Sequence, residues 1–149
     1  MNNEEISEIL CAIHDMTPIH LHNFLENALT QENFDFEKGG LLLTGELNTN
    51  TMTVNTSAIN RQDGLWIRIK REVHDYICTD STTYKAERAE AGSSLKSIIS
   101  ILATALATKF HIAMGIITGI VTLIIISMIK ISKNAWCKLY TEEEIRKLQ

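Results

Sequence analysis

The sequence is poor in cysteine and lacks the segment that directs proteins to secretion. Its three cysteines, an odd number, stand far apart at Cys11, Cys78 and Cys137. This spacing argues against a disulfide framework and favours reduced thiols in a cytoplasm. The first ten residues, MNNEEISEIL, are acidic and contain neither the basic nor the apolar part of a secretory signal. We therefore expect the first half of the chain to lie in the cytoplasm.

No catalytic motif can be recognised either, so the sequence predicts a protein that is not an enzyme and needs no cofactor. Cys78 and Cys137 have no partner base in a recognisable pattern, which leaves a cysteine nucleophile unsupported. Four possible nitrogen or sulfur ligands for zinc stand within twelve residues: Cys11, His14, His20 and His22. Their spacing matches no common zinc motif, so we expect helix packing and surface histidines there, with a metal site as the alternative.

Positive charge is scarce in the first part of the chain. Residues 1–91 contain 7 Lys and Arg against 15 Asp and Glu, a balance of −8, whereas residues 92–149 contain 7 against 3, a balance of +4. The asymmetry indicates two regions in different surroundings. Arg68, Lys70 and Arg71 form a short basic run that could meet lipid headgroups or nucleic acid, or simply face solvent. The acidic balance argues against nucleic acid as a partner.

Residues 1–80 are predicted to form a small α+β domain of helices plus a β-hairpin. Apolar spacing predicts helices over residues 4–14 and from Pro18 to Gln31, with Thr17 as N-cap of the second. The Gly-rich and Asn/Thr-rich stretch that follows predicts a hairpin of Leu41–Leu47 and Thr51–Ile59. An amphipathic helix within 63–80 completes the domain, to which we assign the binding of a protein partner. Residues 81–93 are predicted to be a linker.

Charge is absent from residues 112–129, IAMGIITGIVTLIIISMI, which include eight isoleucines. Eighteen apolar residues reach the lower limit of a membrane-spanning helix. Residues that favour the edges of a bilayer flank the run: Lys109, Lys130, Lys133 and Trp136. The alternative is a helix buried in a soluble oligomer, since a chain this short would hardly surround it alone.

The second apolar segment, residues 95–108, predicts a C-terminal α-helical hairpin over 94–138 that is transmembrane or membrane-inserting. A hairpin keeps both the first domain and the lysines after the run in the cytoplasm, as the positive-inside rule prefers. Fourteen residues would span only about 21 Å, less than the bilayer core of about 30 Å, which favours conditional or oligomeric insertion. Residues 139–149 form a charged tail. His111, at the tip of the hairpin, could gate insertion or simply lie at the interface.

Small residues spaced four apart predict an association face on each arm of the hairpin. These are Ala103 with Ala107 and Gly115 with Gly119. Thr118 and Thr122 lie near the glycines, and hydroxyl residues stripe the first arm. Several copies packed through these faces would line a pore, whereas in the alternative each hydroxyl satisfies a carbonyl of its own helix.

Residues 84–137, which end in KISKNAWC, resemble the tails of small bacterial proteins that join a variable soluble module to an apolar helical hairpin. Such proteins occur in anti-phage defence clusters, and the resemblance implies a membrane effector. We therefore expect a homo-oligomer at the bacterial inner membrane that permeabilises the bilayer or docks there, with its N-terminal domain in the cytoplasm. The alternative is a cytoplasmic, soluble helical scaffold subunit of a larger complex.

Overall fold

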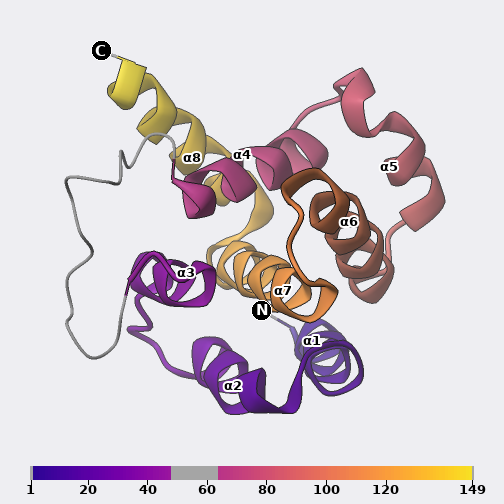
Figure 1. Ribbon diagram of the computed structural model, residues 1–149, viewed down its shortest axis with the longest axis vertical. Coiled ribbons are helices and arrows are strands. Elements are labelled where there is room, and N and C mark those ends of the chain that lie inside the picture. Colours follow the sequence, from indigo (N-terminus) through magenta and orange to yellow (C-terminus); the bar gives the residue numbers. More distant parts are fainter. Residues whose placement is uncertain (1, 48–63, 149) are drawn as a thin grey trace.

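One long apolar helix, α7 (Met114–Ile131), runs through the middle of the molecule, and the other helices surround it (Figure 1). The computed structural model describes residues 2–47 and 64–148, with side chains as far as residue 141. In the view of Figure 1, α1 and α2 lie below α7, α3 lies to its left, and α4, α6 and α8 lie above it. The helices are α1 (Asn3–Met16), α2 (His22–Thr30), α3 (Phe36–Thr44), α4 (Leu65–Cys78), α5 (Lys85–Ala91), α6 (Leu95–Phe110), α7 and α8 (Lys133–Leu148), with short 3₁₀ turns η1 (Ile19–Leu21) and η2 (Thr82–Tyr84).

The first helix begins and ends at side chains that satisfy its free backbone groups. Asn2 accepts a hydrogen bond from the backbone N–H of Glu5 at 2.8 Å, and the Glu5 carboxylate accepts one from the N–H of Asn2, which together form a capping box. The helix predicted over 4–14 is thus confirmed. The prediction that Thr17 begins the second helix is wrong, because its hydroxyl donates to the carbonyl of Ile13 at 2.6 Å and closes α1 instead.

The predicted β-hairpin is contradicted, because the stretch assigned to its first strand begins as helix. Leu41 to Thr44 belong to α3, which starts at Asp35, whose carboxylate accepts from the N–H of Lys38 at 3.0 Å. The second predicted strand, 51–59, lies outside the described residues. Every regular element in 2–47 and 64–148 is helical, so the described fold is all-α.

The glycines that suggested a turn before that strand have a different role. Gly40 lies inside α3, where a Cβ atom would overlap the indole ring of Trp66 from α4. Gly39 packs in the same way against Phe34 and Phe24, at 3.0 and 3.1 Å from a built Cβ. Glycine is tolerated in this helix because it allows two aromatic groups to approach the backbone, which is a tertiary reason that no local pattern reveals.

Part of the segment predicted as a linker is folded. It contains η2 and α5, and Arg88 of α5 binds the C-terminal end of α4 through its guanidinium group. That group donates to the carbonyls of Asp75 and Tyr76 at 2.7 Å each and to the carbonyl of Ser81 at 2.6 Å. The carbonyls of Asp75 and Tyr76 lie in the last turn of α4, where a helix leaves carbonyls without intrahelical partners, so Arg88 caps α4 and fixes α5 against it.

The core is continuous from the first helix to the eighth. Ile9 and Ile13 of α1, Leu25 of α2 and Ile69 of α4 are fully buried in the same cluster as the side chains of α6 and α7. All side chains from Ile117 to Ile126 are buried. One chain therefore encloses this helix without a partner subunit, contrary to the expectation from its length, because six other helices each contribute one apolar face.

A disulfide joins α4 to the first turns of α8, which contradicts the expectation of reduced thiols. Cys78 and Cys137 have Cα atoms 5.8 Å apart, within the usual range for a disulfide, whereas Cys11 is free and exposed. The pairing was not visible in the sequence, because the two cysteines stand 59 positions apart and only the packing of α8 on α4 brings them together.

Replacing Gly40 with alanine should destabilise the protein by about 1–3 kcal/mol, because the added methyl group overpacks the contact between α3 and Trp66. Urea unfolding followed by circular dichroism measures this. Lys38→Ala, an exposed change in the same helix, is the control and should alter the free energy of unfolding by less than about 0.5 kcal/mol. Equal stability of the Gly40 variant and the wild type would contradict the packing of α3 on α4.

The disulfide predicts a specific thiol count. A thiol reagent should titrate one thiol per native chain, that of Cys11, and three after denaturation and reduction. Replacing Cys78 and Cys137 together with alanine should lower the free energy of unfolding by about 2–4 kcal/mol, since the unfolded chain gains freedom. Cys11→Ala serves as the control, and three reactive thiols in the native oxidised protein would refute the pairing.

Candidate functional site: an enclosed apolar hairpin and its uncharged tip

Helices α6 and α7 form an antiparallel hairpin with very few charges. Lys96 and Lys109 are the only charged residues of α6, and α7 has none before Lys130. Of the helices in the described part, α7 alone is long and apolar enough to cross a membrane, and 67% of it is buried in the protein. Its 18 residues give a length of about 27 Å, close to the thickness of a bilayer core.

The predicted association face of α7 is occupied by the chain's own N-terminal helices. A Cβ atom built on Gly119 would lie 2.7 Å from Cδ1 of Leu21, and one on Gly115 would lie 3.0 Å from Cγ of Pro18. The two glycines thus admit the corner between α1 and α2. On α6, Ala103 is buried and Ala107 packs against the core. In this state, the small residues serve contacts within one chain.

The hydroxyl groups near these small residues are satisfied locally. Thr118 donates to the carbonyl of Met114 and Thr122 to the carbonyl of Thr118, each at 2.7 Å. On α6, Thr104 and Thr108 donate in the same way to carbonyls one turn earlier, at 2.8 and 3.2 Å. This arrangement is the alternative to a hydroxyl-lined pore, and it lets α7 carry two buried threonines without unsatisfied hydrogen bonds.

The four residues predicted at membrane edges have separate roles in this fold. Lys109 pairs with Glu72 of α4 at 2.7 Å, and Lys130 donates to the carbonyls of Ala28, at 2.9 Å, and of Gln31 at the end of α2. Trp136 is buried and stacks on Tyr140, with ring centroids 5.8 Å apart. Lys133 is exposed at the start of α8.

The histidines do not join the cysteine in a metal site. His14 pairs with Glu26 at 2.9 Å, and its ring meets that of His22 edge-on at 5.0 Å, while His20 is exposed. The Cys11 thiol donates instead to Asp15 at 3.3 Å. Among the residues that the structure describes, no three His, Cys, Asp or Glu side chains are placed to hold a metal ion.

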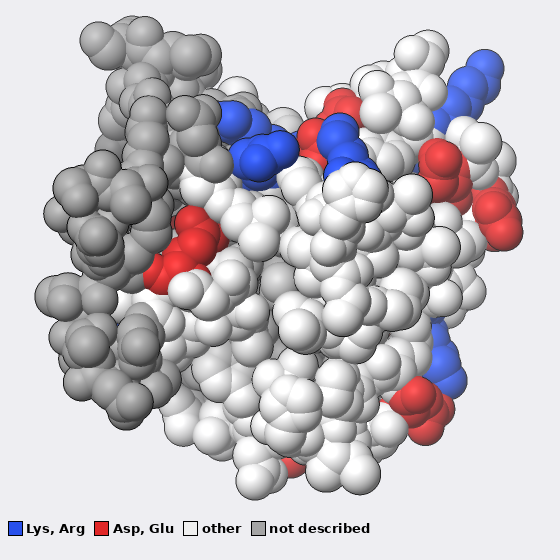
Figure 2. All heavy atoms as spheres, viewed as in Figure 1, with Lys and Arg blue, Asp and Glu red and all other residues white. Residues whose placement is uncertain are grey.

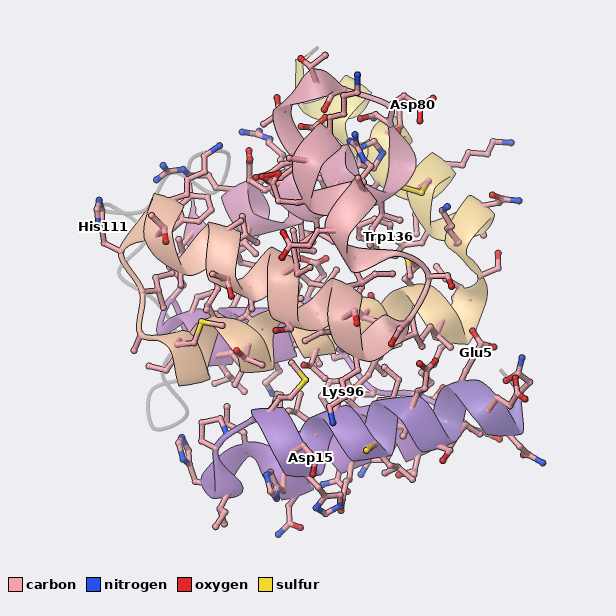
Figure 3. All side chains as sticks on the ribbon, turned by 90° about the vertical axis from the view of Figure 1, so that its right-hand side faces the viewer. Glu5, Asp15, Asp80, Lys96, His111 and Trp136 are labelled. Carbon is pink, nitrogen blue, oxygen red and sulfur yellow. A yellow bond between two sulfur atoms is a disulfide. The ribbon has the colours of Figure 1, made fainter. Side chains whose placement is uncertain are left out.

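Asp15 also links α1 to the apolar hairpin. Lys96 of α6 points toward Asp15 across the two helices, with a distance of 2.8 Å between Nζ and Oδ2 (Figure 3). The hydrogen bond from Lys96 holds the pKa of the Asp15 carboxyl below its usual value. The hydrogen bond to Asp15 raises the pKa of the Cys11 thiol, which keeps this free cysteine in its less reactive protonated form.

Lys70 belongs to a cluster that the sequence did not indicate, together with Glu37, Trp66 and Tyr140. Lys70, part of the run assigned to solvent or a ligand, is only 5% exposed. Its ammonium group binds the Glu37 carboxylate at 2.5 Å and lies 5.3 and 5.5 Å from the ring centroids of Trp66 and Tyr140. The indole N–H of Trp66 donates to the same carboxylate at 2.8 Å. This cluster joins α3, α4 and α8, and we interpret it as structural.

The tip of the hairpin lies at the surface among uncharged residues. His111 closes the turn after α6 in the left-handed conformation (φ 55°) and points away from the protein (Figure 3). Beside the turn, Met114 and Ile116 are 44% and 43% exposed, and Ile19 of η1, next to Pro18, is 85% exposed. The centre of the face in Figure 2 shows no Lys, Arg, Asp or Glu. We call Ile19, Met114 and Ile116 the uncharged tip.

Comparisons with protein-family models, with curated proteins and with solved structures find no match for this chain. The likeness of its tail to those of two-part bacterial proteins stays an expectation from the sequence. The functional proposal below therefore rests on the geometry of α6, α7 and the uncharged tip.

The contact between Gly119 and Leu21 predicts a coupled loss of stability. Gly119→Val should lower the free energy of unfolding by about 1–3 kcal/mol, because its methyl groups collide with Leu21. In a Leu21→Ala background, Gly119→Val should lower the free energy of unfolding by clearly less, because the smaller alanine leaves room for the added methyl groups. A double-mutant cycle from urea unfolding measures the coupling. An equal cost in both backgrounds would contradict the intramolecular role of Gly119.

Proposed function

We propose that this chain is a non-enzymatic bacterial protein that keeps an apolar helical hairpin enclosed in a water-soluble fold and inserts it into the inner membrane on a signal. The observation that carries the proposal is the hairpin itself: α7 has the length and composition of a span, and its tip is exposed and uncharged. The likeness of residues 84–137 to defence-cluster proteins suggests that the inserted form is an effector that permeabilises the bilayer.

The exposed tip supports insertion that starts at the turn between α6 and α7. Burial of an exposed apolar side chain in hydrocarbon is favourable by about 25 cal/mol per Å² of apolar surface. Ile19, Met114 and Ile116 present such surface, and none of the three side chains carries a charge that would have to be desolvated. Lys109 is the charged residue of the hairpin that stands closest to the turn in sequence, and its long side chain could remain at the headgroups.

The packing of α7 supports a conditional rather than a permanent insertion. Lipid tails are about as apolar as a protein core, so moving α7 from the core to the bilayer changes its own solvation little. The unfavourable free energy comes from the surrounding helices, because their apolar inner faces become exposed to water when α7 leaves. A signal that loosens α1 and α2 from α7 would reduce that cost, and we assign the reception of such a signal from a protein partner to the helices within residues 1–80.

Oligomerisation follows from the same step. Gly115 and Gly119 are covered by Pro18 and Leu21 in the enclosed state. If α7 leaves that corner, its small-residue face becomes available to α7 of other copies, where close approach of backbones stabilises helix association in lipid. The small-residue face of α7 would thus contact Pro18 and Leu21 before insertion and α7 of other copies after it.

A second candidate is a soluble helical module that binds a protein through the uncharged tip and never enters lipid. The enclosure of α7 by a single chain favours it, because no membrane or second subunit is needed to cover that helix. The two candidates differ in whether the tip meets hydrocarbon or a protein surface.

Vesicle flotation tests the proposal. Purified protein is mixed with vesicles of bacterial lipid composition, with and without mild acid or low urea as loosening conditions, and the floating fraction is measured. We expect binding under the loosening conditions, reduced about tenfold by Met114→Lys or Ile116→Lys, since a lysine in hydrocarbon costs a few kcal/mol. Dye release from the vesicles then measures permeabilisation.

Leu139→Lys provides the matched control. Leu139 lies on α8 and is 47% exposed, close to the values for Met114 and Ile116, but it is not part of the hairpin. This variant should float as the wild type does. Failure of the wild type to float under every condition, with the protein remaining folded and monodisperse, would leave the soluble module as the function.

A further inference from the structure

A cleft of about 640 Å³ opens at the end of α7 opposite the uncharged tip. Its walls come from the C-terminal turns of α7, the start of α6, the end of α4 and the junction between α7 and α8. The volume lies within the range of about 300–1,000 Å³ typical of small-molecule sites. We propose that this cleft binds a single-chain amphiphile with an anionic head, such as a long-chain carboxylate. The inference is independent of the proposed membrane insertion.

The apolar walls indicate an aliphatic ligand. They are formed by side chains that offer methyl and methylene groups: Ile77, Leu95, Ile98, Ile125, Met128 and Ile129. Around the described cleft, Tyr76 is the only aromatic residue, and its hydroxyl donates to the carbonyl of Glu87 at 3.4 Å. Planar ligands such as nucleotides favour sites with aromatic stacking partners, whereas a hydrocarbon chain needs only apolar surface.

The charges around the cleft favour an anion. Three cations line it, Arg88, Lys130 and Lys133, whereas Glu5 is the only acid among the lining residues that the structure describes. Glu5 already accepts a hydrogen bond from the N–H of Asn2 at the start of α1. The net charge of the lining is therefore positive, which lowers the free energy of a bound carboxylate relative to that of a bound ammonium.

Lys133 is the cation that remains available to a ligand. The guanidinium of Arg88 donates hydrogen bonds to carbonyls at the end of α4, and the ammonium group of Lys130 donates to carbonyls at the end of α2. Within the described part of the chain, Lys133 makes no hydrogen bond or ion pair with its side chain, and it is exposed at the mouth of the cleft. We therefore assign the carboxylate head to Lys133.

The backbone beside Lys133 is strained in a way that suits this role. Ser132, between α7 and α8, has φ 125° and ψ 153°, a conformation almost restricted to glycine. Its hydroxyl accepts from the N–H of Ala135 at 3.2 Å and so caps α8. The sharp turn brings the N-terminal end of α8, the favourable end of a helix dipole for an anion, to the cleft together with Lys133.

Calorimetric titration with laurate below its micelle concentration tests the site in the full-length protein. We expect saturable one-to-one binding, with dodecyltrimethylammonium, which has an alkyl chain of similar length and the opposite charge, at least about tenfold weaker. Lys133→Glu should weaken laurate binding about tenfold, because it reverses the charge at the head. Lys138→Glu, an exposed change on the same helix outside the cleft, should leave the affinity unchanged within about twofold.

Leu95→Trp tests the apolar part of the site, because the larger side chain fills the cleft and should weaken laurate binding. Ile98→Phe replaces it if the Leu95 variant does not fold. Met114→Lys at the uncharged tip should bind laurate as the wild type does, which separates this site from the proposed membrane contact. No laurate binding by the wild type, equal affinity for both detergents, or an unchanged affinity in Lys133→Glu would each overturn the proposal.

Discussion

The enclosure of α7 is the constraint on which the rest of the structure depends. Eighteen residues with a single charge, Lys130 near the end, cannot be left in water, and the neighbouring helices cover that surface with apolar side chains. The glycines of α7 face the corner between α1 and α2, and Gly40 lets α3 approach α4. These close approaches place enough apolar surface around one helix for a chain of 149 residues to bury it alone.

Polar side chains also connect the helices that surround α7. Lys130 caps the end of α2, Arg88 caps the end of α4, and Lys70 joins three helices through Glu37 and two aromatic rings. Each long side chain crosses apolar surface and ends at carbonyls or a carboxylate, so a cation serves the packing of helices and not only their solubility. The disulfide between α4 and α8 adds a covalent link on the side opposite α1 and α2. The link between α4 and α8 is therefore covalent, whereas α1 and α2 are held on α7 by buried apolar side chains and by the hydrogen bonds of Lys130.

The contacts of the N-terminal corner connect the structure to the proposed function. At the N-terminal corner, Pro18 and Leu21 contact the glycines of α7, and Asp15 forms an exposed ion pair with Lys96 of α6 that contributes little to stability by itself. The same corner lies next to the uncharged tip, whereas the cleft with Lys133 lies at the other end of α7. Opening at the corner would release the tip first, and an anionic amphiphile in the cleft would contact the junction of α7 with α8.

The sequence by itself determined most helices and the apolar hairpin, because apolar periodicity and scarcity of charge are local properties. It also supplied the small residues of α7 and the hydroxyls that satisfy their own helix. Tertiary structure alone decided the rest. The Gly-Gly pair before Leu41 indicated a turn until Trp66 and Phe34 were placed against it, and Cys78 met Cys137 only through the packing of α8 on α4. From the sequence alone, Lys70 is interpreted as a surface charge, because its partners come from distant segments of the chain. Gly119 is predicted to lie in an interface between copies, because the same small surface fits either another chain or Leu21. Periodicity reports which face of a helix avoids water, but it does not report what covers that face.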